Sequence, residues 1–172
     1  MKNMKDKIKS VNELKEIIAQ LKENKKIVVW TNGCFDILHI GHVKSLQKAK
    51  ALGDVLIVGL NSDSSVRKLK GGGRPLMPQN ERAEIIAALE CVDYVIIFSE
   101  LRPNKVINIL KPDIHVKGPG YKKDELPETH IVKSYGGRIE IIDPKIPTST
   151  TKTIKKILKV YKSGRIRSDR KT

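Results

Sequence analysis

Two features are scarce in this sequence, and each scarcity excludes classes of protein. The 172 residues include only two cysteines, Cys34 and Cys91, which lie far apart and without metal-ligand spacing. No apolar run approaches the roughly 20 residues that a membrane-spanning helix needs. No N-terminal segment combines an apolar core with a cleavage site. We therefore expect a protein of the reducing cytoplasm that is not integral to a membrane.

Acidic residues are also few relative to basic ones. The chain has 34 Lys and Arg against 19 Asp and Glu, a net charge of +15. Residues 152–172 carry +8 and residues 1–26 carry +4, which leaves +3 for the other 125 residues. A positive charge concentrated at the two ends of the chain is typical of basic terminal segments rather than of a surface that binds a nucleic-acid groove. Nucleic acid is therefore not the expected partner, and a contact between residues 159–171 and a polyanion is kept as an alternative.

The periodicity of apolar residues predicts alternating helices and strands. Ser10 and Glu13 form a capping box ahead of an apolar stripe that ends near Asn24. Short apolar runs predict buried strands at 27–30, 55–60, 94–98, 114–116 and 139–142. Further helices are predicted at 41–52, 81–91, 103–110 and 150–161. Such alternation favours parallel pairing, and hence a three-layer, Rossmann-like α/β fold with a mostly parallel sheet of about five strands.

The length fits one main domain with two flanking segments. We expect an amphipathic leading helix within residues 1–26, the α/β domain in 27–160, and a basic, disordered tail in 161–172. No internal repeat is present. The one low-complexity stretch, Gly71-Gly72-Gly73, lies between Lys70 and Arg74 and predicts a mobile loop with basic flanks.

Two histidines mark the edge of the sheet where ligands of such folds bind, the carboxyl ends of the strands. His39 and His42 are three residues apart at a helix start, so both imidazoles share one face. Gly41 leaves that face open, and a helix N-terminus favours an anion. Histidines that only cap or pack the helix are the alternative. Zinc is disfavoured because no Glu, third His or Cys lies at ligand spacing.

The whole segment carries a family resemblance. TNGCFDILHIGH (31–42) followed by LGDVLIVGLNSD (52–63) resembles the His-x-Gly-His nucleotidyltransferase superfamily. Within it, the chain is most similar to heptose 1-phosphate adenylyltransferases, which make ADP-activated heptose. Further blocks are SVRKLKGGGRP (65–75), ERAEIIAALECVDY (81–94), PDIHVKG (112–118) and Ser149-Thr150-Thr151. The resemblance extends from Val11 to about Leu158.

The resemblance implies a role for each matching residue. His39, His42 and Lys70 would form the catalytic set, with the histidines stabilising charge that builds at the α-phosphorus. Asp36 would fix turn geometry. The nucleotide site would comprise Thr31, Cys34, Phe35, His39, His42, Lys68, Lys117, Gly118, Ser149, Thr150 and Thr151. Lys68 and Lys70 would lie on the flexible glycine loop and clamp the phosphates, and a solvated basic loop is the alternative for them. Ordinary helix capping is the alternative for the hydroxyl residues.

The implied reaction transfers AMP from ATP to a sugar 1-phosphate, with heptose 1-phosphate favoured, and releases pyrophosphate. Mg²⁺ is expected with ATP because it offsets triphosphate charge, although the sequence holds no dedicated carboxylate cage, and a homodimer formed around residues 87–94 is also implied. Pro119-Gly120 and Pro147 depart from the family pattern. They keep open a glycerol 3-phosphate cytidylyltransferase, an FAD synthetase, or a non-enzymatic nucleotide- or RNA-binding module. An aminoacyl-tRNA synthetase is disfavoured because the chain lacks a Lys-Met-Ser-Lys-Ser loop.

Overall fold

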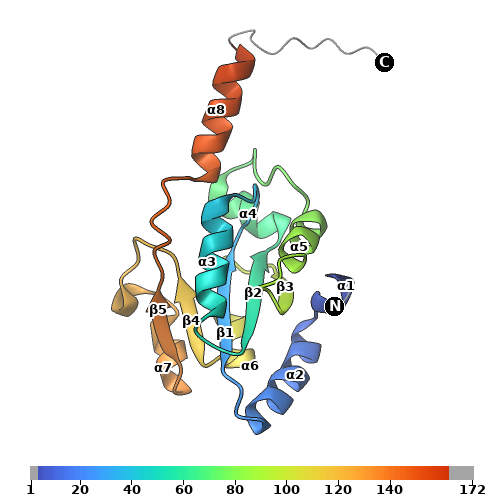
Figure 1. The fold of residues 1–172 in the computed structure, drawn as a ribbon, viewed down its shortest axis with the longest axis vertical. Coiled ribbons are helices and arrows are strands. Elements are labelled where there is room, and N and C mark those ends of the chain that lie inside the picture. Colours follow the sequence, from blue (N-terminus) through green and yellow to red (C-terminus); the bar gives the residue numbers. More distant parts are fainter. Residues whose placement is uncertain (1–3, 163–172) are drawn as a thin grey trace.

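Five parallel strands form one sheet in the computed structural model, which describes residues 4–162 (Figure 1). The strands are β1 (Val28–Gly33), β2 (Val55–Asn61), β3 (Tyr94–Phe98), β4 (Ile114–Lys117) and β5 (Arg138–Ile141). Their order is β3-β2-β1-β4-β5, so the chain turns outward in both directions from β1. The predicted Rossmann-like α/β class is confirmed.

Helices cover both faces of the sheet. On one face lie α3 (Ile40–Lys50) and α5 (Gln79–Ala87). On the other face lie α2 (Val11–Glu23), α6 (Asn104–Leu110) and α7 (Thr129–Ser134). Adjacent residues of β1 divide between the two cores, with Val29 packed under the first pair of helices and Trp30 under the second set. This alternation follows from the two-residue period of a strand.

Four short elements were not predicted by periodicity. They are α1 (Met4–Lys7), α4 (Asp63–Lys70), the 3-10 helix η1 (Lys123–Glu125) and α7. In α4 only Ser65 and Val66 are buried, so the helix has no apolar stripe that its sequence could reveal. Ser62 begins it instead, because its Oγ accepts a hydrogen bond from the Ser65 N–H at 3.2 Å. The prediction that Lys68 and Lys70 lie on the glycine loop is therefore wrong: both belong to α4, and the glycines follow its end.

The N-terminal segment covers the edge of β3. Ile8 pairs with Val95 in a parallel bridge, and the Lys9 N–H donates to the Val95 carbonyl at 2.8 Å. The predicted capping box of α2 is present, since Ser10 and Glu13 each accept the other's backbone N–H. The hydrogen bonds that the Glu13 carboxylate accepts from the Ser10 N–H and Oγ lower its pKa to about 2, with a further contribution from Lys9.

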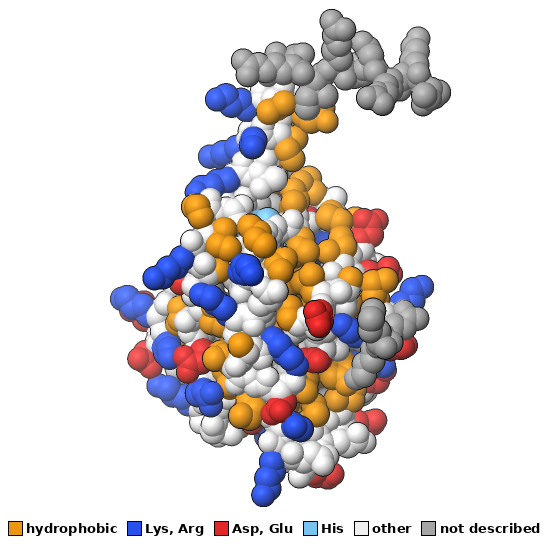
Figure 2. Space-filling model, in the orientation of Figure 1, with side chains coloured by type: hydrophobic (Ala, Val, Ile, Leu, Met, Phe, Trp, Pro, Cys, Tyr) orange, Lys and Arg blue, Asp and Glu red, His pale blue; other side chains and the backbone are white. Residues whose placement is uncertain are grey.

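The last helix, α8 (Thr150–Lys162), extends away from the sheet (Figure 1). Lysines lie along one side of it and apolar side chains along the other (Figure 2). Residues 161 and 162, which the sequence assigns to the tail, are helical, and 163–172 lie outside the described residues. Within residues 4–162, no helix has both the length and the apolar character needed to cross a membrane.

Candidate active site

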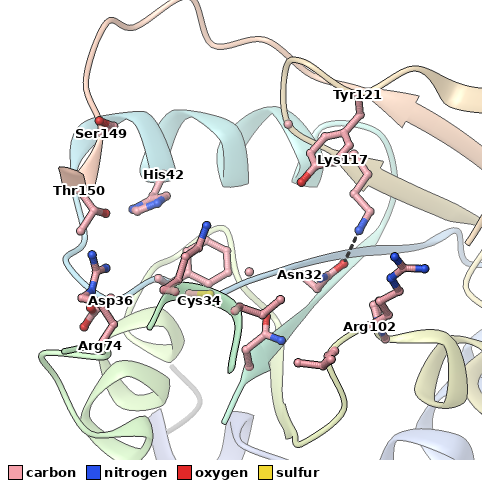
Figure 3. A pocket seen from close by; sticks show the side chains of 18 of the residues that line it. Asn32, Cys34, Asp36, His42, Arg74, Arg102, Lys117, Tyr121, Ser149 and Thr150 are labelled. Carbon is pink, nitrogen blue, oxygen red and sulfur yellow. Dashed lines mark hydrogen bonds and ion pairs between the residues drawn. The ribbon is translucent and has the colours of Figure 1, made fainter. Parts of the chain in front are cut away.

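A cleft of about 730 Å³ opens at the carboxyl ends of the strands (Figure 3). The ends of β1 and β4 lie at its floor, where the strand order changes direction, and such a switch point leaves a crevice between diverging loops. Asn32 and Gly33 contribute from β1, and Lys117 contributes from β4. The segment before α3, the end of α4, the segments after β3 and β4, and the start of α8 complete the wall.

His39 and His42 lie against each other in this cleft. Their rings are stacked with centroids 3.8 Å apart and planes 17° from parallel, and Phe35 meets His42 edge-on at 5.2 Å. Burial lowers the pKa of His42 to about 4, with a further contribution from His39, whose own pKa is lowered by burial. Both rings are therefore neutral at pH 7, and each can donate one N–H. Both Nδ1 atoms are buried without a partner among the described residues.

Asp36 anchors a distant segment of the cleft wall. Its carboxylate is 1% exposed and accepts the N–H groups of Leu76 and Met77 at 2.8 and 3.0 Å, as well as the Arg74 guanidinium. Burial alone would raise the pKa of Asp36, but these donors outweigh it and the pKa is lowered. Asp36 thus fixes the segment after the glycine loop rather than only its own turn, and it holds Arg74 in the cleft.

Arg82 connects several segments of the site through hydrogen bonds. Its side chain is fully buried and donates to the carbonyls of Cys34, Met77 and Asn61. It also forms an ion pair with Asp63 at 2.7 Å. One guanidinium therefore fixes the ends of β1 and β2 relative to the segment that precedes α5.

Lys117 forms a small buried network on the β4 side of the cleft. Its ammonium donates to Asn32 Oδ1 at 3.2 Å, drawn in Figure 3, and to Glu128 Oε1 at 3.0 Å. The side chains of Lys117 and Glu128 are 11% and 4% exposed. An ammonium has three N–H donors, so one is left for a ligand.

The start of α8 closes the opposite side. Ser149 Oγ accepts the Lys152 N–H at 3.2 Å, which makes Ser149 the capping residue of this helix. Thr150 and Thr151 follow in the first turn and line the cleft. In Figure 3, Ser149, Thr150 and His42 lie together, away from Lys117 and Asn32. The starts of α3 and α8 therefore meet at one end of the cleft, and helix starts favour an anion.

The structure brings most of the predicted site residues together. The cleft is lined by Cys34, Phe35, His39, His42, Lys70, Lys117, Gly118, Ser149, Thr150 and Thr151. Two predicted residues do not line it. Thr31 lies within β1, where its hydroxyl donates to the Val116 carbonyl at 3.1 Å, and Lys68 is exposed on α4. The strand predicted at 27–30 is longer than expected, because β1 continues to Gly33.

Several lining residues were not predicted: Asn32, Arg74, Arg102, Tyr121 and Glu128. Arg74 is within a motif block and directly follows the glycines, which was a usable signal. Glu128 had none, because it reaches the cleft only through the packing of α7 against α6 and β5. In residues 4–162, no group of three or more His, Cys, Asp or Glu side chains is arranged to hold a metal ion.

Comparisons with known proteins identify the family of the chain. A family model described as cytidylyltransferase-like matches residues 30–163. The chain is 52% identical over 155 residues to the bifunctional protein HldE of Geobacter sulfurreducens, and 50% identical over 158 residues to that of Syntrophotalea carbinolica. These matches cover 90% and 92% of this chain, respectively, but 32% of each relative. The chain thus spans about a third of the length of these curated relatives.

Solved structures show the same fold. A lipopolysaccharide core biosynthesis protein from Thermoplasma volcanium superposes with a TM-score of 0.58 at 34% identity, covering 69% of this chain and 95% of that chain. A pantoate-beta-alanine ligase from Francisella tularensis superposes with a TM-score of 0.60 at 17% identity, covering 95% and 81%. The second likeness concerns the fold alone.

Proposed function

Because the chain belongs to the cytidylyltransferase-like family, we propose that it is a nucleotidyltransferase that transfers AMP from ATP to a sugar 1-phosphate and releases pyrophosphate. Heptose 1-phosphate is the favoured acceptor. The sequence identity of 50–52% to bifunctional HldE proteins and the likeness to a lipopolysaccharide core biosynthesis protein support this choice. The catalytic set proposed from the sequence, His39, His42 and Lys70, lies in one cleft.

The observation that carries the proposal is the stacked histidine pair at the start of α3, across from the start of α8. Two neutral imidazoles and two helix starts provide N–H donors without a neighbouring free carboxylate, since Asp36 is occupied by Arg74 and backbone N–H groups. Preorganised donors of this kind stabilise negative charge as it develops on a reacting phosphate. A triphosphate fits this end of the cleft better than a neutral ligand does.

The reaction would proceed by direct in-line displacement. An oxygen of the acceptor's phosphate forms a bond to the α-phosphorus while the bond to the α–β bridging oxygen breaks, and the electron pair leaves with pyrophosphate. His39 and His42 would stabilise the α-phosphate, whereas Lys70, Arg74 and the first turn of α8 would hold the departing phosphates. A sugar phosphate is already a nucleophile at neutral pH, so the chain need not supply a general base.

Mg²⁺ is proposed as a companion of ATP rather than as a resident of the protein. The two buried carboxylates that line the cleft, Asp36 and Glu128, are paired with Arg74 and Lys117. The residues therefore fit an ion that is held mainly by phosphate oxygens and water, which is how Mg²⁺ commonly binds at nucleotide sites. When bound, it would offset charge on the triphosphate.

A substrate matrix tests the proposal. ATP or CTP is paired in turn with heptose 1-phosphate, glycerol 3-phosphate and FMN, and pyrophosphate release is followed with and without Mg²⁺. We expect turnover with ATP and heptose 1-phosphate, dependent on Mg²⁺. Turnover of CTP with glycerol 3-phosphate, or of ATP with FMN, would replace this substrate pair by one of the alternatives. No turnover, combined with salt-sensitive RNA affinity, would favour the binding module.

We also propose a cytoplasmic location, since ATP and sugar phosphates are cytoplasmic metabolites and both cysteines are free thiols.

A homodimer formed around residues 87–94 is proposed from the family resemblance alone. The region around 87–94 offers little apolar surface, because Ala87 and Val92 are fully buried and Lys7 donates to the Leu89 and Val92 carbonyls. Leu89 and Cys91 are partly exposed beside α3. Sedimentation of the wild type and of Leu89→Glu tests this interface, and a monomeric wild type would contradict it.

A further inference from the structure

One carboxylate oxygen in the cleft wall has no partner. Glu128 directly precedes α7, is 3% exposed and lines the cleft. Its Oε1 accepts a hydrogen bond from Lys117, whereas Oε2 is buried with no hydrogen-bond partner among the described residues. Buried polar atoms in folded proteins are nearly always paired, so an unpaired carboxylate oxygen beside a ligand cleft indicates a partner supplied by the ligand.

The surroundings of Glu128 define what that partner can be. A phosphate is excluded because a carboxylate repels it. A divalent cation is disfavoured because the Lys117 ammonium lies 3.0 Å from the other oxygen, and the described residues provide no third ligand. A neutral hydrogen-bond donor remains, and a hydroxyl group is the donor that nucleotides and sugar phosphates share.

Lys117 holds the carboxylate ready for such a donor. Because the ammonium also donates to Asn32 Oδ1 at the end of β1, it fixes Glu128 relative to the floor of the cleft. Lys117 therefore acts as a positioning residue for Glu128, in addition to any contact of its own. The phosphate-binding groups, His42 and the start of α8, lie away from Lys117 (Figure 3), so the network faces the part of a ligand that is remote from the triphosphate.

From this arrangement we infer that Glu128 Oε2 accepts hydrogen bonds from the hydroxyl groups of a bound sugar, and that it thereby selects the substrate. We assign these hydroxyl groups to the ribose of the nucleotide rather than to the acceptor sugar. Arg102, a cation suited to the acceptor's phosphate, follows β3, whereas Lys117 and Glu128 belong to β4 and the segment after it, on the other side of β1. The inference rests on the proposed nucleotidyltransferase site.

The test compares ribose and deoxyribose nucleotides by isothermal titration with the full chain. ATP, 2′-deoxy-ATP and 3′-deoxy-ATP are titrated into the wild type, Glu128→Gln and the control Glu125→Gln. Glu125 is an exposed residue of η1 that pairs with Lys122 and does not line the cleft. We expect the wild type and the control to bind at least one deoxy analogue about tenfold more weakly than ATP, the usual size of a hydrogen bond to a charged group.

In Glu128→Gln, the preference for ATP should disappear, because an amide in place of Oε2 no longer accepts a hydroxyl proton. If the wild type shows no preference for ATP over its deoxy analogues, or if Glu128→Gln leaves that preference unchanged, the acceptor is tested next. This test compares kcat/KM for the sugar 1-phosphate and its deoxy analogues in the wild type and in Glu128→Gln. Loss of that preference in the variant assigns Oε2 to the acceptor sugar instead.

A wild type that does not distinguish hydroxyl from deoxy compounds in either arm overturns the inference without reference to any variant. So does a variant that weakens all ligands by one common factor. Nucleotide titration does not require turnover, so a failure of the proposed reaction remains distinguishable from a failure of this assignment.

Discussion

At the scale of single residues, burial determines the charge of the site's histidines. The pKa of His42 is lowered to about 4 by burial and then by the neighbouring His39 ring. A charged imidazole would bind a triphosphate more strongly in the ground state, but a neutral pair avoids placing two like charges 3.8 Å apart. The stack therefore supplies oriented N–H donors over the whole physiological pH range.

The replacements His39→Ala and His42→Ala should each lower kcat by about 100- to 1,000-fold, corresponding to about 2.7–4 kcal/mol, because each removes a preorganised donor. The matched control is His130→Ala, which alters an exposed histidine outside the cleft lining. Steady-state pyrophosphate release provides the measurement. Full activity in either cleft variant would remove the histidines from the mechanism.

A third histidine, His115, should govern acid stability. His115 in β4 is fully buried, and neither ring nitrogen has a partner within residues 4–162; burial, aided by Lys117, lowers its pKa to about 3. Between this value and about 6.5, the unfolded chain binds a proton that the folded chain does not. Stability is therefore present above pH 6.5 and is lost as the pH falls, by about 1.4 kcal/mol per pH unit from this residue.

The variant His115→Leu should remove that dependence. Urea denaturation at pH 7 and pH 5 should show a smaller loss of unfolding free energy for His115→Leu than for the wild type. The exposed His130→Leu should behave as the wild type does. Parallel losses in all three proteins would mean that His115 is not buried as a neutral ring.

At the scale of elements, the sheet and the helices α3 and α8 could be predicted, whereas α4 and α7, which also shape the cleft, could not. In β2, β3 and β4 most residues are buried, as is the first half of β1, so burial on both faces leaves a clear sequence pattern. The edge strand β5 has only Ile139 buried, yet its short apolar run was still recognisable. In α4 and α7 only two residues each are buried, which leaves no stripe to detect. Glu128 reaches the site through α7, and Arg74 through Asp36, and such tertiary contacts have no local signature.

The contribution of Arg82, which connects the ends of β1 and β2 to the segment before α5, can be tested by replacing it. Replacing it by Met would leave Asp63 without its ion-pair partner and would remove the Arg82 donor from three carbonyls. We expect Arg82→Met to lower the unfolding free energy by about 1–3 kcal/mol, the usual cost of leaving buried acceptors unsatisfied. Arg67→Met, on the exposed side of α4, should change it by less than about 0.5 kcal/mol. Similar urea midpoints for the two variants would contradict this role.

At the scale of the whole molecule, the charge is separated from the site. The two terminal segments carry most of the +15, and the lysines of α8 lie along one side of a helix that extends away from the sheet. The cleft's own cations are instead paired or directed at the phosphate end, as Lys117 and Arg74 are. The fold thus gathers a few cations in one cleft instead of presenting a continuous basic surface there.

The fate of the labelled phosphates of ATP tests the central claim most directly. ATP labelled at the α-phosphate or at the γ-phosphate is incubated with Mg²⁺ and heptose 1-phosphate, and the products are separated. The α label should appear in the sugar nucleotide and the γ label in pyrophosphate, and neither should move in a variant that lacks both His39 and His42. A γ label in the sugar product, or transfer that survives in that variant, would contradict nucleotidyl transfer at this cleft.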